Sequence, residues 1–262
     1  MIRTPDHLSP FQAMTCPELP AIDPRGLANG RHHRSFLKPT TGRKGLANAA
    51  WSPKTQRDHS YLSFGERNVH YWLHFQANVV DIREQYPCFD PDELAAYLDS
   101  GRRIPRNKVM TLDFVLTLAP TTNKPLRYVG VSVKENHELE SGEDVWERFA
   151  RERRFCGEHG WAHTIYTEKE VSRDVARRTR RVALWASDSD IASDAANAQR
   201  LAELMPHGTS EVSLNALMVR AARKLACTCD DAYRLLSVAG MLGFVNIDFT
   251  REVSDRLRVV FK

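Results

Sequence analysis

The chain has 262 residues, of which 42% are hydrophobic, and its Lys, Arg, Asp and Glu residues leave a formal net charge of +4. This length and composition predict one sizeable core, or a main core with a small second domain. No apolar run approaches the roughly 18 residues of a membrane span, and the opening MIRTPDHLSP lacks a signal-peptide core. We therefore expect a cytoplasmic protein that is not attached to a membrane.

The cysteines are odd in number and scattered along the chain: Cys16, Cys88, Cys156, Cys227 and Cys229. This pattern argues against a disulfide framework and fits a reducing compartment. Cys227 and Cys229 have no second Cys or His pair at zinc spacing, so the sequence gives no support to a zinc site there.

Positive charge is concentrated near the N-terminus, where eight Lys or Arg and no acid lie between Arg25 and Arg57. A solvated tail and a segment lying on DNA phosphates both fit such a cluster. A second basic stretch, RDVARRTRR from Arg173 to Arg181, favours nucleic acid. We predict an irregular basic arm over residues 1–58. The residues expected to contact DNA are Arg31, Arg34, Arg43 and Lys44.

The middle of the chain alternates helix and strand patterns, which predicts one α/β domain over residues 59–185. A helix is expected to begin at Ser63, and an amphipathic helix to cover residues 144–159. Strands are expected at 79–87, 109–116, 127–134 and 161–167.

The polar stretch ASDSDIASD (186–194) is interpreted as a linker to a C-terminal domain over residues 195–262. Helical patterns at 195–204, 211–225 and 229–240 precede two short strand patterns at 244–249 and 256–261. Helices followed by a hairpin predict a winged-helix-like domain. We expect it to dock protein rather than read bases, because Asp230 and Asp231 open the helix that would enter the major groove.

Two of the expected strands place polar residues on a shared face. Residues two apart on a strand lie on the same side, so Met110, Leu112, Phe114 and Leu116 predict an apolar face with Asp113 on the other. In the next strand, Val129, Val131 and Val133 are apolar, with Ser132 and Lys134 opposite. A hairpin centred between Thr122 and Asn123 brings Asp113 opposite Ser132.

A strand carboxylate followed by a polar-x-Lys pair is the pattern that metal-dependent phosphodiester cleavage requires. Mg²⁺ takes oxygen ligands, and a lysine offsets charge on the reacting phosphate. Such a pattern also occurs by chance on structural strands. Glu66 is a third candidate for this site. It lies at i, i+3 and i+7 spacing with Val69 and Leu73, which places it on the inward-facing stripe of a helix. Its spacing from Ser63 equally fits a helix cap, so the sequence leaves both roles open.

These segments together resemble the PD-(D/E)xK nuclease superfamily and, more narrowly, the TnsA family of endonuclease subunits of heteromeric transposases. The resemblance covers about residues 57–172 and is carried by LSFGERNVHYWL, VVDIREQYP, KVMTLDFVL, VGVSVK and WAHTIYTEKE. By this resemblance Glu66, Asp113, Ser132 and Lys134 form the catalytic site. Glu66, Asp113 and the Val133 carbonyl are the implied metal ligands. Relatives place Gln, and the wider superfamily Glu or Asp, at position 132, so Ser132 is expected to be a weaker or indirect ligand.

The resemblance implies a restriction-endonuclease-like mixed sheet flanked by helices, with Mg²⁺ as cofactor and Mn²⁺ as an alternative. The implied activity is cleavage of the non-transferred 5′ strands at transposon ends during cut-and-paste transposition. The implied partners are double-stranded DNA at those ends, a DDE transposase subunit (TnsB-like) and an AAA+ ATPase regulator (TnsC-like), in a bacterial cytoplasm.

Two rival functions remain open at this point. One is a restriction or repair nuclease of the same superfamily, which a neighbouring transposase gene would argue against. The other is a non-enzymatic winged-helix DNA-binding regulator, which would tolerate loss of Asp113. His70 and His74 lie four apart on a helix and favour packing over a metal pair. Arg83 and Glu84 fit either a structural ion pair or a DNA contact.

Overall fold

The computed structural model describes residues 18–37, 48–89, 99–100, 109–120, 125–140 and 142–262. Its centre is a four-stranded sheet in the order β3-β4-β5-β6. These strands are β3 (Val79–Cys88), β4 (Met110–Leu118), β5 (Arg127–Val133) and β6 (Ala162–Tyr166). The first two pairings are antiparallel and β5 pairs with β6 in parallel, which confirms the predicted mixed sheet.

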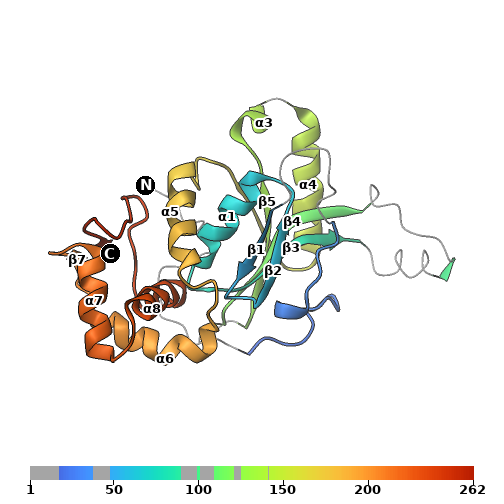
Figure 1. The fold of residues 1–262 in the computed structure, drawn as a ribbon. Helices are drawn as coiled ribbons and strands as arrows, with labels where there is room; N and C mark the ends of the chain where they lie inside the picture. The colour runs from blue at the N-terminus through green and yellow to red at the C-terminus, as the bar shows by residue number, and fades with distance from the viewer. Residues whose placement is uncertain (1–17, 38–47, 90–98, 101–108, 121–124, 141) are drawn as a thin grey trace.

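Helices cover both faces of this sheet (Figure 1). On one face α1 (Phe64–His74) and α5 (Arg173–Leu184) pack over a core of aliphatic side chains that includes Val69, Phe114 and Val131. On the other face α4 (Glu143–Glu158) packs over a smaller cluster that includes Tyr86 and Cys156. The short helix α3 (Asn136–Glu140) connects β5 to α4. The predicted helices and strands of this part of the chain are confirmed.

The hairpin register expected from the loop is confirmed. β4 and β5 pair from Leu118↔Arg127 to Phe114↔Val131, and one further step in this register brings Asp113 opposite Ser132. The backbone N–H of Val133 donates to Asp113 Oδ2 at 2.7 Å. This contact joins Asp113 to the β5 backbone between Ser132 and Lys134.

The prediction that β4 has one apolar face is wrong at Leu112. Phe114 and Leu116 pack on the α1 and α5 side, whereas Leu112 packs under α4, beside Gly130. The change of face occurs where Gln85 takes a left-handed backbone (φ 48°), between the pairs Glu84↔Phe114 and Tyr86↔Leu112. The pleat is interrupted there, so strict alternation does not continue through Asp113.

The N-terminal stretch is more ordered than the predicted arm. Within residues 1–58, β1 (Asn48–Ser52) forms an antiparallel pair with β2 (Arg57–Tyr61), and η1 (Gly30–His32) is a short 3-10 helix. Asp23 is buried and forms an ion pair with Arg83 of β3. A buried ion pair fixes this segment to the sheet, so the described part is not a free arm.

The C-terminal helices are α6 (Ile191–Ala202), α7 (Leu214–Leu225) and α8 (Cys229–Leu242), as the helical patterns predicted. The predicted linker is shorter than expected, because Asp190 caps α6, and residue 195 lies inside that helix. The expected hairpin of 244–249 with 256–261 is reduced to one bridge, Ile247↔Phe261. Instead β8 (Val260–Phe261) pairs with β7 (Gly208–Thr209). The winged-helix assignment stays a prediction.

The C-terminal helices share a core with the α/β part of the molecule. Their buried cluster contains Tyr71 and Phe75 of α1 together with Val182 and Ala183 of α5. At Gly240 of α8 an added Cβ would lie 3.2 Å from the Phe75 ring, so a glycine permits this close helix contact. Among the described residues, no helix is long and apolar enough to cross a bilayer.

Candidate active site

Glu66 begins the candidate site from the first turn of α1. Ser63 is the N-cap of this helix, and its hydroxyl oxygen accepts the Glu66 backbone N–H at 3.1 Å. The Glu66 carboxylate accepts hydrogen bonds from the Leu62 N–H, the Ser63 hydroxyl and the Gln85 amide. The side chain is 5% exposed, which confirms its inward position. Capping and an inward carboxylate thus occur together in one residue.

Asp113 lies on β4, buried and electrostatically coupled to Glu66. Burial and the nearby Asp113 carboxylate raise the pKa of Glu66 to about 8. Burial likewise raises the pKa of Asp113, although the Val133 N–H, Arg148 and Lys134 oppose this. Two buried carboxyl groups of like charge raise each other's pKa when no cation lies between them. This pair is the strongest electrostatic anomaly of the site.

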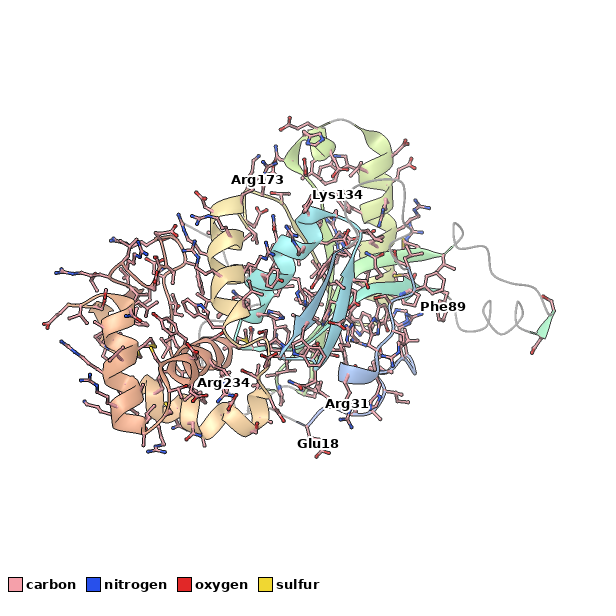
Figure 2. All side chains as sticks on the ribbon, viewed as in Figure 1. Glu18, Arg31, Phe89, Lys134, Arg173 and Arg234 are labelled. Carbon is pink, nitrogen blue, oxygen red and sulfur yellow. The ribbon has the colours of Figure 1, made fainter. Side chains whose placement is uncertain are left out.

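Lys134 follows the last residue of β5 and is half-buried. Its charge acts on Asp113, as the pKa of that carboxyl group shows. Its side chain lines a groove of about 910 Å³ between α1, the end of β5 and α5. Figure 2 shows Lys134 at the same end of the molecule as Arg173, which opens α5. The lysine therefore stands between the buried carboxyl pair and an open surface.

Ser132 occupies a different environment from the other three residues. It is 1% exposed and lies beneath α4, where its hydroxyl donates to Glu152 Oε2. His163 of β6 lies 2.9 Å from the same hydroxyl oxygen. Burial acts to raise the pKa of Glu152, but hydrogen bonds from His163, Ser132 and Arg148 outweigh it, so the pKa lies below its ordinary value. Ser132 thus contacts an ionised carboxylate of this chain.

Sequence reasoning missed four polar neighbours of the site: Gln85, Arg148, Glu152 and His163. Arg148 donates to Glu152 at 2.7 Å from one turn earlier on α4, an i, i+4 spacing that the sequence displays. The sequence of α4 therefore contains the spacing that indicates this Arg148–Glu152 contact. Gln85 gave none, because its role depends on the left-handed backbone described above.

The donor set fits a hard divalent cation. Two buried carboxyl groups with raised pKa values gain a compensating charge when such a cation binds between them. Among the described residues, no three His, Cys, Asp or Glu side chains gather closely enough to form a metal site by themselves. Backbone carbonyl, water and phosphate oxygens would complete the coordination, as is usual for Mg²⁺. The Val133 carbonyl stays a predicted ligand.

Arg31 and Arg34, two of the four predicted DNA-binding residues, lie away from this site. Arg31 and Arg34 are exposed, and Figure 2 shows Arg31 at the opposite end of the molecule from Lys134. Arg43 and Lys44 fall outside the residues that the structure describes. Their contact with DNA stays a prediction.

Two ambiguities of the sequence resolve into structural roles. Arg83 pairs with Asp23, while Glu84 pairs separately with Arg57 and His59. His70 and His74 are buried with their ring centroids 4.4 Å apart, and they form hydrogen bonds with the hydroxyl groups of Tyr61 and Ser52 respectively. These contacts agree with the packing role that the sequence favoured.

The structure thus combines a mixed sheet with a buried carboxyl pair and a lysine at the end of β5. Residues 76–168 match the model of the TnsA-like endonuclease N-terminal domain. The chain is also 30% identical over 156 residues to transposon Tn7 transposition protein TnsA of Escherichia coli. This alignment covers 56% of this chain and 55% of that protein. Both matches agree with the resemblance to the TnsA family seen in the sequence.

The match has a limited extent that bears on the site. The chain spans about half the length of the relative that it matches. Asp113, Ser132 and Lys134 fall inside the matched domain, whereas Glu66 precedes it. The domain assignment thus rests on the sheet, and the role of α1 rests on the contacts of Glu66 described above.

Proposed function

We propose that this protein is a metal-dependent DNA endonuclease that cleaves the non-transferred 5′ strands at transposon ends. One observation carries the proposal: the buried pair of Glu66 and Asp113, with Lys134 beside it, lies on a TnsA-like endonuclease domain. Neither carboxyl group has a cationic partner within hydrogen-bonding distance among the described residues. A structural carboxylate at such depth normally has one.

Each residue of the site has a distinct part in this proposal. Glu66 and Asp113 hold Mg²⁺, or Mn²⁺ in its place, which supplies Lewis-acid stabilisation of the charge that builds on the reacting phosphate. Lys134 places a second positive charge next to that phosphate and helps to orient the attacking water. Ser132 acts indirectly: its hydroxyl is held by Glu152, so it positions the β5 backbone rather than serving as a strong ligand. The products are a 3′-hydroxyl and a 5′-phosphate.

The proposed setting is a transposition complex. The relative with 30% identity is named as a transposition protein of Tn7, and this supports a role at the ends of a mobile element. The partners that we propose are double-stranded DNA, a DDE transposase that processes the other strands, and an AAA+ ATPase regulator. The C-terminal helices are our proposed docking site for a protein partner.

A strand-resolved cleavage assay tests the proposal. End-labelled duplex carrying a transposon end is incubated with the protein and its partner transposase, with Mg²⁺ or with EDTA. We expect Mg²⁺-dependent nicks on the 5′ strands only. Cleavage that persists in EDTA contradicts the metal requirement, and equal cutting of unrelated DNA without the transposase supports a restriction or repair nuclease instead.

A further inference from the structure

The groove that Lys134 lines is strongly basic, and part of its charge has no counterion. Four arginines of α5 and one of α1 contribute to its walls: Arg67, Arg173, Arg177, Arg180 and Arg181. The acids in the wall are Glu135 and Glu168, and Glu168 is already bound to the Asn136 N–H. Positive charge therefore predominates along the groove.

The arginines of α5 fall into two groups. Arg177, Arg178 and Arg181 all form ion pairs with Glu252, a residue of the C-terminal segment. Arg173 and Arg180 do not take part in this cluster. Helix α5 thus directs some of its charge toward the protein and some toward solvent.

Arg67, Arg173 and Arg180 form no ion pair or side-chain hydrogen bond with any residue in the described ranges. Arg67 lies over the Phe64 ring, and its buried Nε has no hydrogen-bond partner there. Burial and the nearby charge of Arg180 lower the pKa of Arg67, so the two guanidinium groups lie close enough to repel each other. Such an arrangement is destabilising unless an anion binds.

Resting on the proposed function, we propose that this groove binds the DNA backbone beside the cleaved bond, through phosphate contacts to Arg67, Arg173 and Arg180. Arginine suits this role because its planar guanidinium forms paired hydrogen bonds with phosphate. Arg173 and Arg180 are seven residues apart on α5, which separates them by about 10 Å along the helix axis. One DNA strand advances by about 3.4 Å per nucleotide, so this spacing fits phosphates about three nucleotides apart.

The position of the groove identifies DNA rather than a single small anion as the occupant. Lys134 lies in the same groove and its charge acts on Asp113, so a strand held there passes beside the Glu66 and Asp113 pair. Exposed Arg173 and Arg180 of α5, half-buried Arg67 of α1 and Lys134 at the end of β5 contribute to this groove from three elements, so the cations extend along it rather than meet at one point. An extended row of cations matches the repeating charge of a nucleic acid backbone.

The test is DNA binding by the full chain, measured without divalent metal so that cleavage does not interfere. Fluorescence anisotropy of a short labelled duplex is recorded over a series of KCl concentrations for the triple variant R67A/R173A/R180A. We expect affinity to fall by at least about tenfold and the log–log salt slope to shrink by nearly three units, about one per lost phosphate contact. The triple arginine-to-lysine variant should keep most of the slope, because it keeps the charge.

Arg200→Ala is the matched control, since Arg200 is an exposed arginine on α6 that contacts only Asn197 in the described structure. It should leave both affinity and slope unchanged. An unchanged slope in the triple alanine variant, or an equal loss in Arg200→Ala, overturns the inference. Retained binding in wild type with no Mg²⁺-dependent cleavage would contradict the nuclease proposal while leaving the groove as a DNA site, so the two failures are distinguishable.

Discussion

Two buried glutamates, Glu84 and Glu66, lie close to Gln85, and the protein shifts their pKa values in opposite directions. Glu84 forms a buried ion pair with Arg57 and contacts His59; although burial alone would raise its pKa, these partners hold it well below its usual range. Glu66 is buried to a similar depth, but burial and the charge of Asp113 together raise its pKa to about 8.

The difference shows how a folded chain separates structural charge from functional charge. Glu84 forms an ion pair with Arg57, so its carboxylate is neutralised without a ligand from outside the chain. Glu66 and Asp113 have no cation within ion-pairing distance among the described residues, and the hydrogen bonds and more distant charges of the chain do not offset the effect of burial, so a bound cation would stabilise their ionised forms. Buried carboxyl groups without an ion-pairing partner, in a protein that pairs Glu84 with Arg57, are therefore the best marker of the site.

The sharpest test replaces Asp113 with Asn. We expect cleavage to fall by at least about 1,000-fold, equivalent to about 4 kcal/mol in activation free energy, because the proposed metal ligand is lost. Stability should be unchanged or slightly higher, since burial disfavours the Asp113 carboxylate and the Asn amide oxygen can still accept the Val133 N–H. Strand-resolved cleavage and a urea denaturation curve measure the two effects. An Asp113→Asn protein that cuts at the normal rate would show that the site is wrongly assigned.

Glu84→Gln should give the opposite result. Removing this carboxylate leaves Arg57 and His59 buried without their partner, and breaking a buried ion pair destabilises a protein by about 3–5 kcal/mol. The residual folded protein, assayed at low temperature, should keep its Mg²⁺-dependent cleavage. Urea denaturation provides the free energy of unfolding. A stable Glu84→Gln variant without activity would place Glu84 in the catalytic site instead.

The third prediction concerns pH. Between pH 4.5 and about 8 the unfolded chain has lost the Glu66 proton while the folded protein retains it. Metal-free stability should therefore fall as pH rises through this range, by up to about 1.4 kcal/mol per pH unit from this group. Glu66→Gln should remove that part of the slope, and Mg²⁺ should reduce it in wild type. Thermal melts across pH measure both, and identical slopes in wild type and variant would contradict the prediction.

The smallest effect is expected at Ser132. Ser132→Ala removes a hydroxyl that acts through Glu152, so cleavage should fall by less than about tenfold, well below the loss in Asp113→Asn. Ser132→Gln introduces a longer side chain beneath α4, where Glu152 and His163 fill the space, and should lower stability by about 1–3 kcal/mol. Rates and melting curves for both variants decide this. Complete inactivation by Ser132→Ala would make the serine a direct ligand.

Much of this arrangement was predictable from the sequence because it depends on local periodicity. The alternation in β5, the length of the β4–β5 loop and the stripe on α1 together placed Glu66, Asp113 and Lys134 near one another. The site's supporting residues were not predictable in the same way. Glu152 and His163 reach Ser132 from a helix and a strand that are distant in sequence, and their contacts depend on tertiary packing.

The errors have a similar origin. The switch of Leu112 to the α4 side follows from one left-handed residue on the neighbouring strand, which no pattern within β4 reveals. The stretch before residue 58 was expected to be irregular because it is rich in Pro, Gly and basic residues. Its described part is held by Asp23 and Arg83, a pair that lies 60 positions apart in the chain.

Helix α1 has consequences for anyone who divides this protein into fragments. Its first turn carries Glu66, while its last turns place Tyr71 and Phe75 in the core shared with the C-terminal helices. A truncation before α6 would uncover that apolar surface, and isolated C-terminal helices would carry its counterpart. Exposed patches of this kind promote aggregation. The α/β part and the C-terminal helices therefore do not separate as independent units. A fragment bounded only by the residues that match the endonuclease family model would cut through their shared core.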